Sequence, residues 1–323
     1  MGNLIKDHIL VSNFNNSGNL QGTGTTIVDV APDLSSVNLF AQIDPNSLPG
    51  PCPGGVGLTT ALVVLRSGWV IVGSLPTTDG SAATAEAGCL IVLDSSGNPV
   101  ETFFGSLISG PWDMVAADSD HEAKLFVTNV LNGTVAASPN VVKQGTVLRI
   151  NLVISPNSMP SIESMTIVGS GFSERTDPDA LVIGPTGVGL SPRGNFDKDS
   201  PWKFGEKGEP VLYVADSLNN RIAIIPDALD RTTSAGTGFT LSKGGSLNDP
   251  LGLIVAPNGH ILTVNGNDGF ITEITPQGKQ ITTQLLDNTG APPGAGTLFG
   301  LALDPARGVF FVDDGSNTLN LLH

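Results

Sequence analysis

The chain is short of basic residues, of long apolar runs and of helical patterns, and each shortage excludes a class of protein. It has 15 Lys and Arg against 30 Asp and Glu, and the resulting net charge of −15 opposes the phosphate contacts on which nucleic-acid affinity depends. Its apolar runs are of strand length, too short to cross a membrane as helices. A phosphate-binding loop that opens a helix is missing as well, because no segment keeps helical spacing. We expect no nucleic-acid partner and no membrane insertion.

Glycine and proline, in contrast, are abundant. The chain has 40 Gly and 23 Pro beside 40% hydrophobic residues, which is typical of short strands joined by tight turns. Its 323 residues exceed the usual size of one hydrophobic core, yet no charged or Pro/Ser-rich linker divides them. A single array of repeats over residues 1–323 explains how a chain of this length can fold without a linker between separate domains.

The repeat itself is a short phrase: an apolar run of β type, a polar residue and a turn rich in Gly, Asn and Ser. Its spacing of 49 residues occurs twice in succession, from Asp216 to Asn265 and from Asn265 to Asp314. The six copies are His8-Ile-Leu-Val-Ser-Asn13, Trp69-Val-Ile-Val-Gly-Ser74, Lys124-Leu-Phe-Val-Thr-Asn129, Val211-Leu-Tyr-Val-Ala-Asp216, His260-Ile-Leu-Thr-Val-Asn265 and Val309-Phe-Phe-Val-Asp-Asp314.

Each phrase belongs to a group of strands. In the fifth repeat an alternating segment and the turn Pro257-Asn-Gly259 precede it, and the strands 269–274 and 280–285 follow it. Four antiparallel strands in about 40 to 50 residues make one blade of a β-propeller. We predict an all-β, six-bladed β-propeller of four-stranded antiparallel blades. Approximate blade bounds are 1–48, 49–108, 109–171, 172–245, 246–290 and 291–323.

The phrase Val211-Leu-Tyr-Val-Ala-Asp-Ser-Leu-Asn-Asn-Arg-Ile222 resembles the NHL-repeat consensus, and the blade pattern of the whole chain is similar to six-bladed propellers of the NHL-repeat and SMP-30-like type. The resemblance is specific for fold and not for activity, since such propellers include lactonases, lyases, phosphotriesterases and pure binding modules.

The strand count departs from that pattern. The first blade begins at His8 with its second strand, and the last ends at His323 after its third, which leaves about two strands missing from six full blades. We expect the ring to close nevertheless, with residues 318–322 near residues 8–13 and residues 1–7 disordered or covering the gap. Unpaired strand edges are expected at this closure.

The candidate site is the mouth of the axial channel, where the turn after each second strand and the loop into each innermost strand emerge together. The polar residues expected there are Asn13, Ser74, Asn129, Asp216, Asn265 and Asp314 at the strand ends, and Asp113, Thr186 and Asp249 in the inter-blade loops, with Trp112 either lining a pocket or packed in the core. Such oxygens suit a hard cation such as calcium. The same residue types also cap turns, and both interpretations remain open.

The resemblance narrows the metal hypothesis. SMP-30-like enzymes hold calcium with Glu, Asn and Asp, but the strand that would carry the Glu is absent here, so only Asn129, Asp216 and Asn265 correspond by blade position. Histidine offers no alternative at the mouth: His8 and His260 begin their strands, roughly 17 Å from the polar strand ends. A Ser-His-Asp triad or a zinc site is therefore not expected.

Two cysteines, Cys52 and Cys89, are expected at the mouth end of the second blade and predict a disulfide, the alternative being two buried thiols in a cytosolic protein. With the low Lys content, the disulfide favours an extracellular or periplasmic protein, although no signal peptide opens the chain.

The first functional hypothesis is an exported propeller that binds a small molecule, glycan or protein at the channel mouth without chemistry. The alternative is a calcium-dependent hydrolase or lactonase.

Overall fold

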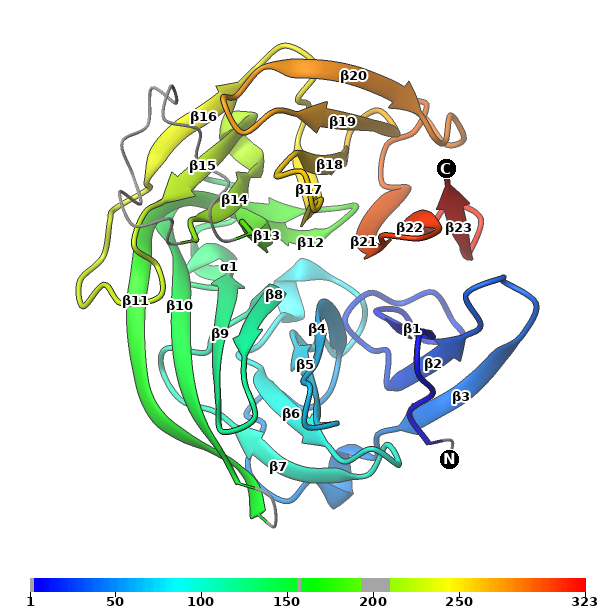
Figure 1. Ribbon diagram of the computed structural model, residues 1–323, viewed down its shortest axis with the longest axis vertical. Helices are drawn as coiled ribbons and strands as arrows, with labels where there is room; N and C mark the ends of the chain where they lie inside the picture. Colours follow the sequence, from blue (N-terminus) through cyan, green and yellow to red (C-terminus); the bar gives the residue numbers. More distant parts are fainter. Residues whose placement is uncertain (1–2, 156–157, 193–209) are drawn as a thin grey trace.

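The computed structural model describes residues 3–155, 158–192 and 210–323, and it confirms the six-bladed β-propeller. Six antiparallel sheets form a ring around a central axis (Figure 1). The first three sheets contain β1 (Ile9–Ser12), β2 (Thr26–Val30) and β3 (Val37–Gln42); β4 (Leu58–Val64), β5 (Val70–Ser74), β6 (Cys89–Leu93) and β7 (Pro99–Phe103); and β8 (Pro111–Asp118), β9 (Glu122–Asn129), β10 (Val142–Ser155), β11 (Ser158–Asp177) and β12 (Leu181–Ile183).

The other three sheets contain β13 (Pro185–Leu190), β14 (Leu212–Asp216), β15 (Arg221–Ile225) and β16 (Phe239–Lys243); β17 (Pro250–Val255), β18 (Ile261–Asn265), β19 (Phe270–Ile274) and β20 (Gln280–Leu285); and β21 (Leu298–Asp304), β22 (Gly308–Asp313) and β23 (Thr318–Leu322). Helical structure in the described residues is limited to α1 (Thr134–Ala137) and the 3-10 turns η1 (Pro45–Ser47), η2 (Ala82–Thr84) and η3 (Ser217–Asn219). No described helix is long and apolar enough to cross a membrane.

The first and last blades have three strands each, as the strand count predicts. β1 pairs with β2 as the second strand of a complete blade pairs with its third, so the first blade has no innermost strand among the described residues. β23 pairs with β22 and forms the outer edge of the last blade, in which the described part of the chain supplies no fourth strand.

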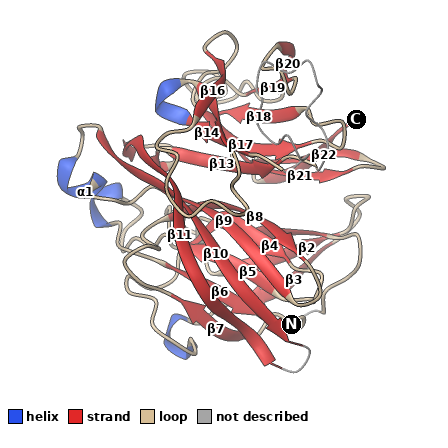
Figure 2. Cartoon of the chain, turned by 60° about the vertical axis from the view of Figure 1, so that its left-hand side comes forward, coloured by secondary structure: helices blue, strands red, loops and turns tan. Residues whose placement is uncertain are grey.

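The expected boundary at residue 171 between the third and fourth blades needs correction. β11 continues to Asp177 and pairs with β12, so the third blade extends to Ile183 in a sheet of five strands. Gly171, at a φ of 83°, is the extra residue of a β-bulge between Ser170 and Phe172 rather than a turn. The long, curved β10 and β11 run down one side of the molecule (Figure 2).

Apolar clusters fill five of the six interfaces between neighbouring blades. Phe40 of the first blade packs with Val70 of the second, Phe126 of the third with Val214 of the fourth, and Val264 of the fifth with Phe311 of the last; similar clusters join the second blade to the third and the fourth to the fifth. Each fully buried side chain of this kind stabilises the fold by about 1.5–3 kcal/mol. In the described residues no such cluster joins the last blade to the first.

Asn3 and Leu4, the first described residues of the N-terminal segment, do not cover that open interface, whereas Asp7 borders it and residues 1 and 2 lie outside the described residues. The amide of Leu4 donates to Ser95 O at 2.8 Å, and the hydroxyl of Ser96 donates to Asn3 Oδ1 at 3.1 Å. Leu4 also packs on the cluster between the first two blades. Residues 3 and 4 therefore lie against a turn of the second blade, away from the last blade.

Candidate functional site

The open interface between the first and last blades is a cleft of about 1520 Å³. β1 and β2 form one wall, β21, β22 and β23 form the other, and the innermost strand β4 lies between them. The cleft therefore occupies the place that the missing innermost strand of the first blade would take. We call it the closure cleft.

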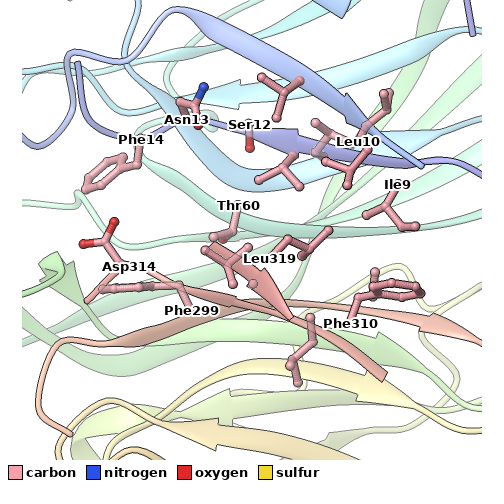
Figure 3. Close-up of a pocket in the computed structure, with 18 of the residues that line it drawn as sticks. Ile9, Leu10, Ser12, Asn13, Phe14, Thr60, Phe299, Phe310, Asp314 and Leu319 are labelled. Carbon is pink, nitrogen blue, oxygen red and sulfur yellow. The ribbon is translucent and has the colours of Figure 1, made fainter. Parts of the chain in front are cut away.

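The side chains in the closure cleft are mostly apolar with polar groups at one end. Figure 3 shows Ile9 and Leu10 facing Phe310 and Leu319 across it, with Thr60 between the two walls. Asn13, Phe14, Phe299 and Asp314 gather at the mouth end. This combination of apolar walls and a few polar groups is typical of ligand sites.

An apolar cluster, not a polar pocket, lies at the mouth end of the ring. Trp112 packs there with Leu75, Leu181 and Leu251, and Phe14 and Phe299 border the cluster. Leu181 reaches it from the first position of β12, with a positive φ of 61°, directly after the segment 178–180. Asp177 Oδ1 accepts the amides of Asp179 and Ala180 and so holds that segment in a turn. Trp112 is buried in this cluster and also lines the closure cleft.

Three of the predicted strand-end residues are buried and hold inter-blade loops. Ser74 Oγ accepts Gly57 N at 2.9 Å, Asn129 Oδ1 accepts Ser109 N at 3.2 Å, and Asn265 Oδ1 accepts Asn248 N at 3.1 Å. In each case the side chain fixes the loop that leads into the innermost strand of its own blade. Turn capping therefore accounts for these three positions.

Asp216, the fourth buried strand-end residue, already forms an ion pair with the side chain of Arg221. Its Oδ2 accepts Arg221 Nε at 2.6 Å and its Oδ1 accepts Asn219 Nδ2 at 2.8 Å. The hydrogen bonds of Asn129, Asp216 and Asn265 stay within their own blades, so these residues do not fit a shared calcium site. Nor does the described part of the chain contain a cluster of three His, Cys, Asp or Glu placed to hold a metal ion.

The sixth position of the predicted ring is shifted by one residue. Asp313, not Asp314, pairs with Leu298 in the register in which Asn265 pairs with Pro250. The equal spacing misled because the connection from Asn265 to Leu298 is one residue shorter than the equivalent connection from Asp216 to Pro250, whereas the hairpins themselves have the same length. Asp314 instead lines the closure cleft, where burial and then the neighbouring charge of Asp313 raise the pKa of its carboxyl.

The three predicted loop residues have separate roles. Asp113 lies on the innermost strand β8, where Met114 N and Val188 N donate to its carboxylate. The surrounding protein at the centre of the ring raises the pKa of this carboxyl to about 7. The side chain is nevertheless partly exposed to solvent. Thr186 is buried and contacts Ser217 Oγ and Pro250 O. Burial and then the charge of Asp177 raise the pKa of Asp249 to about 7.

Of the ten predicted binding residues, the closure cleft thus brings together Asn13, Trp112 and Asp314. The sequence pattern did not predict Phe14, Phe299 and Leu319 as residues that line a binding site. The available signal was the strand count, which predicts unpaired edges at the closure.

The predicted disulfide is present. Cys52 and Cys89 are bonded at an S–S distance of 2.06 Å. Cys89 lies on β6 opposite Ser74, while Cys52 lies in the connection between the first two blades. The bond therefore fixes that connection to the second blade.

Comparisons with known proteins support the fold. No family model and no curated protein matches the chain. A calcium-binding protein, regucalcin, from Agrobacterium tumefaciens is 13% identical with a TM-score of 0.53, covering 90% of this chain and 78% of that one. A gluconolactonase from Xanthomonas campestris is 12% identical with a TM-score of 0.53, covering 95% and 87%.

A catalytically inactive virginiamycin B lyase from Staphylococcus aureus with quinupristin is 14% identical, has a TM-score of 0.50, and covers 99% of this chain and 86% of that one. At these identities the likeness shows the fold alone. The chain is a six-bladed propeller similar to the regucalcin and gluconolactonase structures, with an open interface between its first and last blades.

Proposed function

We propose that the protein is an extracellular binding propeller whose ligand occupies the closure cleft. One observation carries the proposal: five blade interfaces are filled with apolar side chains, whereas the sixth is a cleft of about 1520 Å³. Contiguous apolar surface left open to water marks binding sites in soluble proteins. The disulfide supports a location outside the reducing cytosol.

The cleft offers a ligand two kinds of contact. Phe299, Phe310 and Leu319 supply apolar area, each worth about 1.5–3 kcal/mol when fully covered. Asn13, Thr60 and Asp314 supply hydrogen-bonding groups that orient a ligand. Only the surplus over the cost of association appears as affinity, so we expect micromolar binding for a small apolar probe.

The experiment is a titration with the fluorescent probe 1-anilinonaphthalene-8-sulfonate. Gly300 lines the cleft, and a side chain added there would meet only Val312 Cγ2 at 3.7 Å and Thr60 Cγ2 at 3.9 Å, so Gly300→Phe fills the cleft without clashing at its Cβ. We expect the wild type to bind the probe and Gly300→Phe to lose most of this binding. Ile281→Phe, on the outer strand β20, is the matched control and should bind like the wild type. Equal binding by all three proteins would contradict the proposal.

The alternative is a calcium-dependent hydrolase or lactonase, as the names of two structural neighbours suggest. Asp113 is the observation that favours testing it, because a part-exposed carboxyl with a pKa of about 7 on an innermost strand suits a general base. The residues predicted as calcium ligands do not fit, so we expect the melting temperature to change by less than about 1 °C between calcium and a chelator. A calcium-dependent rise, with lactone hydrolysis lost in Asp113→Asn, would favour the alternative.

A further inference from the structure

Strand β1 presents an unpaired backbone edge to the closure cleft. Asn13 N donates to Thr26 O at 2.9 Å, and the register pairs Val11 with Val28 and Ile9 with Val30. Hydrogen-bonded pairs alternate along an antiparallel ladder, so these three residues bond to β2 and the residues between them do not. The N–H and C=O groups of Leu10 and Ser12 therefore point to the other edge, where the described part of the chain supplies no strand.

The other five blades show what belongs at this edge. In each of them an innermost strand pairs antiparallel with the strand equivalent to β1, as β4 does with β5 and β17 with β18. The ring of innermost strands β4, β8, β13, β17 and β21 is interrupted between β21 and β4. The closure cleft lies at that interruption and is lined by both of those strands.

The length and charge of the cleft define what fits there. Its lining follows the first blade from Asp7 to Phe14, and the extended part of this segment, the four residues of β1, spans about 13 Å. Asp7, Asp179 and Asp314 line the cleft and form no ion pair with the described residues, and the chain as a whole carries a net charge of −15. Arg307, a cation on the lining, is paired with Asp304 at 3.2 Å. The rim is therefore acidic.

We propose that the ligand of the closure cleft is an extended segment of a partner polypeptide, apolar at alternate positions and basic at its ends, which adds a strand antiparallel to β1. The proposal rests on the proposed function and names its ligand class. Main-chain bonds to Leu10 and Ser12 give affinity, and the apolar walls select the side chains, as in other cases of β-strand addition. Lysine or arginine at the peptide ends meets the acidic rim.

The probe is a synthetic peptide that copies residues 57–65, which include the innermost strand β4, with two lysines at each end. Fluorescence anisotropy should show saturable binding to the wild type and binding at least tenfold weaker when glutamates replace the lysines. Two further peptides carry N-methyl groups at alternate residues, in one phase or the other. Since only one edge of the added strand faces β1, we expect one phase to abolish binding and the other to leave it within about twofold.

Two protein variants test the same contact from the other side. Ser12→Pro removes an N–H that faces the cleft and also the hydroxyl that donates to Thr59 O, whereas Ser12→Ala removes only the hydroxyl. We expect Ser12→Pro to bind about tenfold more weakly than Ser12→Ala, the equivalent of one hydrogen bond. The methylated peptides keep the test decisive if Ser12→Pro does not fold.

Four results would overturn the inference. Binding of the anilinonaphthalene probe without binding of any peptide would leave the proposed function standing and reject its ligand class. Equal binding of both methylated peptides would mean that no strand pairing occurs. A dimer in size-exclusion chromatography that the peptide dissociates would identify the occupant as a second copy of this chain. Failure of both the dye and the peptide would reject the proposed function with the inference.

Discussion

Glu174 should make the protein less stable as pH rises, and Glu174→Gln should remove that dependence. The side chain is fully buried on β11; its Oε1 accepts Asn132 N at 3.1 Å, while Oε2 has no hydrogen-bond partner in the described structure. Burial raises the pKa of this carboxyl from 4.5 to about 8, the hydrogen bonds from Asn132 opposing the shift. The folded state therefore binds a proton that the unfolded state has already lost between about pH 4.5 and pH 8.

The sign and size follow from that difference. Below about pH 4.5 both states are protonated and the stability does not change with pH through this group; as pH rises from there to about 8, stability falls by at most about 5 kcal/mol, since each pH unit between the two pKa values costs about 1.36 kcal/mol. An unfolding entropy of about 0.7 kcal/mol/K for 323 residues converts this to about 7 °C in melting temperature.

The assay is thermal unfolding by circular dichroism at pH 5 and pH 8. Glu174→Gln should melt close to the wild type at pH 5 and several degrees higher at pH 8. Glu163→Gln, an exposed glutamate on the same strand, is the control and should follow the wild type at both values. Titration of Asp113 and Asp249 is common to all three proteins and cancels in the comparison. A Glu174→Gln variant with the wild-type pH dependence would refute the reasoning.

Two further predictions concern the residues first assigned to the mouth. Reduction of Cys52–Cys89 should cost about 4 kcal/mol through the 37-residue separation that the bond spans, and so lower the melting temperature by about 6 °C; non-reducing mass spectrometry that finds two free thiols would contradict this. Asp216→Asn leaves the Arg221 charge buried without its partner and should destabilise the fold by about 3–5 kcal/mol in urea unfolding. A near-neutral Asp216→Asn that abolishes calcium binding would instead support the metal hypothesis.

The strand pattern predicted the fold because each blade repeats the same phrase, an apolar strand that ends in a polar residue before a turn; β5 and β14, for example, are buried along their whole length. The incomplete first and last blades followed from counting those patterns, and the Cys52–Cys89 bond from the blade ends at which the two residues were placed. The bulge at Gly171 was not predicted, because glycine in a sequence is as typical of a turn as of a bulge, and its positive φ is known only from the structure. The position of Asp313 was not predicted either, because the connection from the fifth blade to the last is one residue shorter than the connection before it, and equal spacing in sequence then falls on a different register position.

The candidate site was harder to predict because Asn, Asp and Ser at strand ends serve turns and ligands alike. Asn129 and Asn265 resemble channel ligands in sequence, yet their amide oxygens hold the loops beside them. The closure cleft is defined by a strand that is absent, and its lining residues, such as Phe299 and Leu319, belong to ordinary apolar strands. Only the arrangement of the blades in space brings them together.

The most direct test of the open closure is residue-resolved hydrogen exchange of β1 in the protein without any added ligand. We expect the exchange rate to alternate along β1: the amides of Ile9 and Val11, bonded to β2, exchange slowly, whereas those of Leu10 and Ser12 exchange at the rate of an exposed strand edge. Slow exchange at all four amides would mean that a strand already pairs with β1, that the ring is closed, and that no cleft is available to a ligand.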